Sequence, residues 1–106
     1  MAKYLITATY TADGAKGLMK DGGTKRRQAA EAAIKSVGGR MEAFYFAFGE
    51  NDAIVLIDAP DNVSVASASL AINASGAVQT KTVVLLTPEE IDQATKKSAT
   101  YQPPGR

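Results

Sequence analysis

The chain contains no histidine and no cysteine. It therefore lacks the usual general base near neutral pH, the thiolate nucleophile and the preferred side-chain ligands of zinc and copper. Disulfide bonds are excluded, and no metal site is expected. Catalysis would have to rely on carboxylates, hydroxyls, Lys, Arg or a bound cofactor. The sequence identifies neither a cofactor nor a catalytic residue.

An excess of charge of one sign is also missing, because twelve basic side chains oppose eleven acidic ones. Attraction to a polyanion is weak at this balance, so we expect no nucleic-acid partner. No apolar run approaches the roughly 18 residues of a membrane span, and no signal segment precedes the first strand pattern. We therefore expect a cytoplasmic protein with no membrane partner.

The length of 106 residues suits one layered domain. We assign residues 1–98 to this domain and residues 99–106, which include Pro103-Pro104-Gly105, to a flexible C-terminal tail.

Turn and cap signals divide the domain into alternating strands and helices. Gly38-Gly39 marks a helix end, and Thr87-Pro88-Glu89-Glu90 is a capping box that starts a short C-terminal helix. The βαββαβ order, with two right-handed crossovers, predicts a ferredoxin-like α+β fold whose four-stranded antiparallel sheet has both long helices on one side. The predicted strands are Lys3–Tyr10, Arg40–Phe48, Ala53–Asp58 and Val78–Leu86, and the helices are Thr24–Val37, Pro60–Ser75 and Thr87–Lys97, with a weakly helical stretch over Thr11–Asp21.

Both faces of the predicted sheet are apolar. The second strand alternates Phe44, Phe46 and Phe48, which we expect in the core, with Met41, Ala43, Tyr45 and Ala47. Helices cover only one face, and a second apolar face would exceed what a monomer normally exposes. We therefore expect a homodimer or higher homo-oligomer formed through the sheet face. The alternative is cover by the C-terminal helix, whose clear apolar residues are only Ile91 and Ala94.

Several segments resemble the GYD-domain family of small bacterial proteins. They are residues 10–23, Lys25-Arg26-Arg27, residues 42–49, residues 73–78 and residues 80–82, and the resemblance extends to about Lys97. It implies a ferredoxin-like fold of the dimeric α/β-barrel type and no settled activity. The Gly-x-Tyr-Asp segment of that family is Gly49-Glu50-Asn51-Asp52 here. Asn51 suits a tight turn, so we expect the turn of the family to be retained here. Any role that the family's Tyr has in a pocket is not transferred to this chain.

The first candidate ligand-binding residues are Arg26 and Arg27, at the start of a predicted helix where cations oppose the helix dipole. Arg26 lies four residues before Ala30 and extends the apolar stripe of that helix. One interpretation is an anion site that uses one or two guanidinium groups. The simpler one, which we favour, is that these side chains extend into water or pair with acidic neighbours such as Glu31 or Asp52.

The second candidate pair is Tyr45 with Asp58. A hairpin loop over residues 49–52 would place Tyr45 opposite Leu56 and Asp58 on the diagonal. An acid beside a phenol on an apolar face could accept a proton or orient a ligand hydroxyl. We favour the plainer alternative, a polar pair at the end of the sheet.

Lys81 in the last strand is the remaining candidate ligand-binding residue. It can equally be an edge-strand charge that discourages aggregation, and we favour this interpretation.

Two functions remain open. The first is a homo-oligomeric binding or accessory protein with a pocket between helix and sheet for a small anionic or aromatic molecule. The second is a small enzyme of the dimeric α/β-barrel type, similar to monooxygenases, decarboxylases or cyclases, that works without His or Cys.

Overall fold

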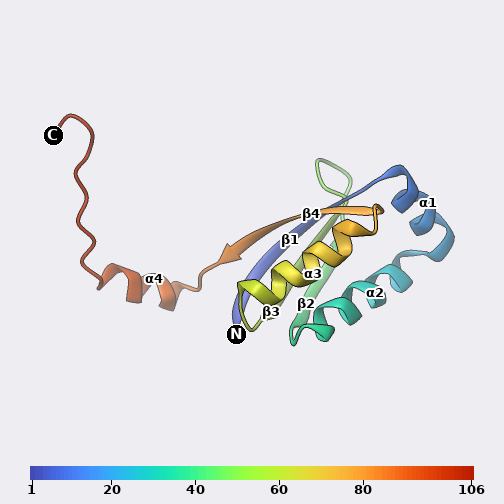
Figure 1. Cartoon of the computed structure of the whole chain (residues 1–106), viewed down its shortest axis with the longest axis horizontal. Coiled ribbons are helices and arrows are strands. Elements are labelled where there is room, and N and C mark those ends of the chain that lie inside the picture. Colours follow the sequence, from blue (N-terminus) through green and yellow to red (C-terminus); the bar gives the residue numbers. More distant parts are fainter.

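The computed structural model describes residues 1–106 and contains four strands and four helices (Figure 1). The strands are β1 (Ala2–Tyr10), β2 (Arg40–Phe46), β3 (Ala53–Ala59) and β4 (Val78–Leu85). The helices are α1 (Ala12–Asp21), α2 (Gly23–Ser36), α3 (Asn62–Ala74) and α4 (Pro88–Thr95).

The sheet has the strand order β2-β3-β1-β4, and the paired strands are antiparallel. Helices α2 and α3 lie side by side over one face, as Figure 1 shows. This arrangement confirms the predicted ferredoxin-like α+β fold.

Side-chain caps start three of the helices, and the sequence predicted the one at α4. The Thr11 hydroxyl accepts a hydrogen bond from the Gly14 N–H at the start of α1, and the Asp61 carboxylate accepts one from the Ser64 N–H at the start of α3. The capping box of Thr87 and Glu90 is present at α4. Such caps satisfy backbone donors that a helix start otherwise leaves without partners.

Gly22 and Gly23 set the angle between α1 and α2. Gly22 has a φ of 83°, in the left-handed region where glycine is favoured. A Cβ atom on Gly23 would lie 2.9 Å from Cε2 of Phe46. The glycine pair therefore lets the start of α2 approach β2 closely.

Strict alternation along β1 and β3 assigns the two faces of the sheet. Helix-side residues of β1 and β3 form most of the core together with residues from the helices, and the two largest fully buried side chains are Tyr4 and Ile57. The hydroxyl of Tyr4 donates to Oδ1 of Asn62 at 2.6 Å, which ties β1 to the start of α3. The buried helix-side residues of these two strands are Tyr4, Ile6, Ala8, Ala53, Val55, Ile57 and Ala59, whereas Asp58 is buried on the opposite face.

The prediction for β2 was wrong in two respects. A bulge at Glu42 breaks the alternation, so that Met41 and Phe44 both face the helices. The strand ends at Phe46, which pairs with Ala53, so the hairpin loop spans residues 47–52. Phe48 therefore lies in this loop and is fully exposed rather than in the core.

The opposite face of the sheet is uncovered, and its register defines three rows across the strands. We call it the open face. The apolar row is Ala43–Leu56–Leu5–Val83. On one side of it lies the row Tyr45–Ile54–Thr7–Lys81, and on the other the row Arg40–Asp58–Lys3–Leu85.

Helix α4 does not cover the open face. It and the tail extend away from the sheet, as Figure 1 shows, and contribute to a longest dimension of 57 Å against 33 and 22 Å. Every hydrogen bond of residues 87–106 is internal to that segment. No helix of the structure is both long and apolar enough to cross a membrane.

Candidate functional site

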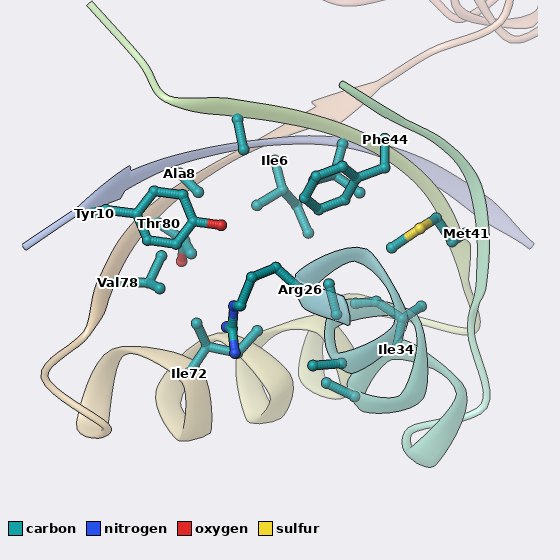
Figure 2. A pocket seen from close by; sticks show the side chains of 15 residues that line it. Ile6, Ala8, Tyr10, Arg26, Ile34, Met41, Phe44, Ile72, Val78 and Thr80 are labelled. Atoms are coloured by element: carbon teal, nitrogen blue, oxygen red, sulfur yellow. The ribbon is translucent and has the colours of Figure 1, made fainter. Parts of the chain in front are cut away.

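A cavity of about 110 Å³ lies between the helix-covered face of the sheet and helices α2 and α3. Figure 2 shows the sheet curving over it and the two helices below. Thirteen of its 15 lining residues are hydrophobic. The lining comprises Ile6, Ala8, Tyr10, Arg26, Ala29, Ala30, Ala33, Ile34, Met41, Phe44, Ala53, Val55, Ile72, Val78 and Thr80.

The cavity exists because small side chains meet across it. Helix α2 presents alanines at positions 29, 30 and 33, and the facing strands present Ala8 and Ala53. The larger residues Phe44 and Ile34 complete the wall beside these alanines. The space is open to solvent on one side, because Ala29 is exposed and Arg26, Ala30 and Ala33 are only half-buried.

Arg26 brings the only charged side chain to the cavity lining. It lies in the first turn of α2 on the same stripe as Ala30 and Ala33. In Figure 2 its side chain runs from α2 across the cavity toward Ile72 of α3, below Tyr10 and Val78 of the sheet. The prediction that Arg26 continues the inward face of this helix is consistent with this position.

The guanidinium of Arg26 has no protein partner. It takes part in none of the four ion pairs of the structure and in none of its side-chain hydrogen bonds. The sequence interpretation in which Arg26 pairs with Glu31 or Asp52 is therefore wrong. Arg26 is half-buried. A cation that is partly withdrawn from water and has no ion-pair partner favours an anion nearby.

Two hydroxyl groups accompany Arg26, those of Tyr10 and Thr80. The Tyr10 hydroxyl has no hydrogen-bond partner in the protein, and Figure 2 shows it directed into the cavity. The Thr80 oxygen accepts a hydrogen bond from Nδ2 of Asn73 at 2.8 Å, while the Thr80 N–H donates to Oδ1 of Asn73. The Thr80 proton is therefore free to be donated. All three polar side chains at the cavity offer donors.

The other predicted ligand-binding residues lie elsewhere. Arg27 is exposed on α2 and does not line the cavity. Tyr45, Asp58 and Lys81 are on the open face, on the far side of the sheet from the cavity. Lys81 is exposed on β4, which is an edge strand as expected for a protective charge. Of the five predicted ligand-binding residues, only Arg26 therefore lines the cavity.

The predicted proximity of Tyr45 and Asp58 is wrong because the hairpin register differs by two residues. Tyr45 pairs with Ile54, and Asp58 pairs with Arg40. The buried Asp58 carboxylate accepts hydrogen bonds at 3.0 Å from both Arg40 and Lys3. The hydrogen bond from Arg40, followed by that from Lys3, lowers the pKa of Asp58. A carboxylate held in this way is a poor general base near neutral pH.

Lys3 is shared between two carboxylates at the same end of the sheet. Its ammonium group also contacts Glu42, the residue in the bulge of β2. The hydrogen bond to Glu42, and then that to Asp58, raises the pKa of Lys3. This charged cluster joins three strands, and each of its four side chains has a partner of opposite charge within it.

Sequence reasoning did not identify Tyr10 and Thr80. The alternation of β1 was sufficient for Tyr10, because it shares the face of Tyr4, Ile6 and Ala8. Thr80 follows from its register opposite Ala8. That pairing depends on the connection from β3 through α3 that brings β4 beside β1, which no local pattern specifies.

The GYD domain profile matches residues 4–95, nearly the whole chain. The chain belongs to the GYD domain family. Comparison with curated proteins gives no match.

Two solved structures share the fold of this GYD domain. The leucine response regulatory protein LrpA of Mycobacterium tuberculosis is 14% identical, with a TM-score of 0.51 over 81% of this chain and 51% of that one. MtbAldR is 18% identical, with a TM-score of 0.54 over 81% of this chain and 52% of that one. The GYD domain therefore spans about half the length of each of these proteins, and at such identities the likeness concerns the fold alone.

The segment that corresponds to the family's Gly-x-Tyr-Asp closes the hairpin beside the cavity. Oδ2 of Asp52 accepts a hydrogen bond from the Tyr10 N–H at 2.8 Å, and the Asp52 N–H donates to the Ala8 carbonyl at 2.9 Å. Asp52, the acidic residue of this segment, thus anchors the loop to the end of β1, where Tyr10 lines the cavity. Asn51 occupies the preceding loop position and is half-buried.

Proposed function

We propose that this GYD domain is a homo-oligomeric binding module that takes a small organic anion into the cavity below the sheet. The observation that carries the proposal is the guanidinium of Arg26, which lies in an apolar cavity without an acidic partner. Arg is suited to such a site because its planar fork of donors matches oxyanions and is less strongly hydrated than an ammonium group.

Geometry supports binding more than catalysis. The hydroxyls of Tyr10 and Thr80 and the guanidinium all donate, and no lining side chain is a carboxylate or an amine that would act as a base near neutral pH. Asp58, the acid on which the enzymatic alternative relied, is held between two cations. No specific observation favours the alternative of a small enzyme.

The test compares Arg26→Met with Arg27→Met in a thermal-shift panel of phosphate, aliphatic carboxylates and aromatic acids. Both variants lose one positive charge from adjacent positions of α2, but only Arg26 lines the cavity. At a ligand concentration of about ten times Kd, binding stabilises the folded state by about 1.4 kcal/mol. For a domain of this size we expect a rise in Tm of roughly 6–11 °C.

We expect this ligand-induced shift to be retained in Arg27→Met and lost in Arg26→Met. If no anion in the panel gives a shift that depends on Arg26, the proposed function is wrong. Circular dichroism of both variants establishes that each is folded.

We also propose that the open face forms the interface between two copies. The row Ala43–Leu56–Leu5–Val83 is apolar from one edge of the sheet to the other, with Ile54 and Leu85 on either side of it. Ile54 and Val83 are exposed by 38% and 50% in the isolated chain. Burial of such a surface against the same surface of a second copy gives a closed two-fold dimer.

Sedimentation velocity at micromolar concentration tests the interface. We expect the wild-type chain to sediment as a dimer or higher oligomer and Ile54→Ser/Val83→Ser to dissociate. The matched control is Val63→Ser/Leu70→Ser, which changes two exposed apolar residues of α3. A monomeric wild type, or dissociation only in the control, would show that the open face is not the interface.

A further inference from the structure

We infer that the ligand of this cavity is a monocarboxylate without an amino group, carrying a compact branched or aromatic body. The inference rests on the proposed function and specifies the chemical class of its ligand. It follows from three features of the lining, namely its charge, its hydrogen-bonding groups and its size.

Charge limits the ligand to one negative group. Arg26 is the only charged residue in a lining that is otherwise almost wholly hydrophobic. One guanidinium neutralises one carboxylate, and the two can form paired hydrogen bonds in a plane. A dicarboxylate or a phosphate dianion would retain a second charge in apolar surroundings, which is unfavourable without another cation.

The hydrogen-bonding groups exclude an amine. The hydroxyl protons of Tyr10 and Thr80 are available to a carboxylate, since neither donates to a protein group. No Asp or Glu lines the cavity, so an ammonium group would have no counter-charge there. A zwitterionic amino acid is therefore expected to bind at least about a hundredfold more weakly than the matching acid without its amine.

Size sets the hydrocarbon body. A dry cavity of about 150 Å³ with apolar walls is able to hold benzene. The cavity here is about 110 Å³. A body of roughly four to six carbon atoms fits this volume, with the carboxylate directed toward Arg26. The aliphatic and aromatic walls, including Ile6, Val55, Met41 and Phe44, suit a branched chain or a ring.

The decisive ligands are matched in shape. Leucine, 4-methylpentanoate and 4-methylpentanamide share one carbon skeleton, and they differ in the amine or in the charge of the acid. Isothermal titration calorimetry would measure each of them, together with benzoate, phosphate and the dicarboxylate succinate, on the wild-type chain. We expect 4-methylpentanoate to bind with a Kd at least a hundredfold below that of leucine. The amide and phosphate should be weaker than 4-methylpentanoate by at least tenfold.

Arg26→Met and Arg26→Gln should each raise the Kd for 4-methylpentanoate at least tenfold, and Arg27→Met should leave it unchanged. If leucine, phosphate or a dicarboxylate binds as tightly as 4-methylpentanoate, and that binding depends on Arg26, the ligand class is wrong while the proposed function stands. If no anion shows dependence on Arg26, both are wrong. The two Arg26 variants differ in polarity, so a folding defect in one leaves the other to decide.

Discussion

Filling the cavity should stabilise the unliganded protein and block its binding site at the same time. Ala33 is a residue of α2 that lines the cavity between this helix and the sheet. Ala33→Leu adds three carbon atoms, each worth about 0.8 kcal/mol when buried. Full burial of all three would contribute about 2.4 kcal/mol. Because a rigid site is never filled without some strain, we expect a net gain of about 1–2 kcal/mol.

Urea unfolding and thermal scans measure this gain. Ala32→Leu is the matched control, because Ala32 is the adjacent residue of α2 and is exposed. A substitution at such a surface position usually changes stability by less than about 0.5 kcal/mol. We expect Ala33→Leu to raise Tm by roughly 4–16 °C and Ala32→Leu to have little effect.

The same variants should differ in binding. Ala33→Leu should abolish the calorimetric signal of 4-methylpentanoate, and Ala32→Leu should retain it. Loss of stability by more than about 1 kcal/mol in Ala33→Leu would indicate an overpacked core, and hence no free volume at this position. Stabilisation with unchanged ligand binding would place the binding site elsewhere.

Three further predictions address the site and the periphery. Tyr10→Phe should raise the Kd for 4-methylpentanoate about tenfold by calorimetry without loss of stability, because the Tyr10 hydroxyl has no protein partner, and Tyr101→Phe should change neither quantity. Asp58 has a lowered pKa, so its stabilising contribution is present above the pKa of the unfolded chain and is lost as the pH falls through the folded pKa. Urea titrations should show the stability difference from Asp58→Asn shrinking as the pH falls below the ordinary pKa of an aspartate, and a constant difference would contradict this. Residues 87–106 form no hydrogen bond with the rest of the domain, so their removal should change Tm by less than about 2 °C. A fall in Tm of more than about 5 °C would show that this segment packs on the domain.

The fold was predictable because its signals are local. The capping box at Thr87, the glycine pair after α2 and the alternation of β1 each act over a few residues, and each is present as expected. The turn formers of residues 49–52 also indicated a hairpin. They did not reveal that Ala47 and Phe48 belong to the loop. These two apolar residues continue the pattern of the strand in sequence, but the β2–β3 pairing ends before them, at Phe46 and Ala53.

The site was only partly predictable. The spacing of α2 placed Arg26 on the stripe of Ala30 and Ala33, which is a property of one helix. Whether an acidic side chain lies near its guanidinium depends on elements far apart in the chain. The volume of the cavity beside the alanines depends on such elements too. Arg26 and Arg27 look equivalent in sequence, and one helical step of about 100° is what separates a cavity residue from an exposed one.

The bulge at Glu42 determines which residues of β2 lie on each face of the sheet. Without it, strict alternation would put Met41 and Phe44 on opposite faces. With it, both side chains line the cavity, while Ala43 and Tyr45 remain on the open face. The displaced Glu42 is also the carboxylate that contacts Lys3 at the charged end of the sheet. One inserted residue therefore shapes the cavity wall and leaves the open face apolar, so the proposed ligand site and the proposed interface depend on the same irregularity.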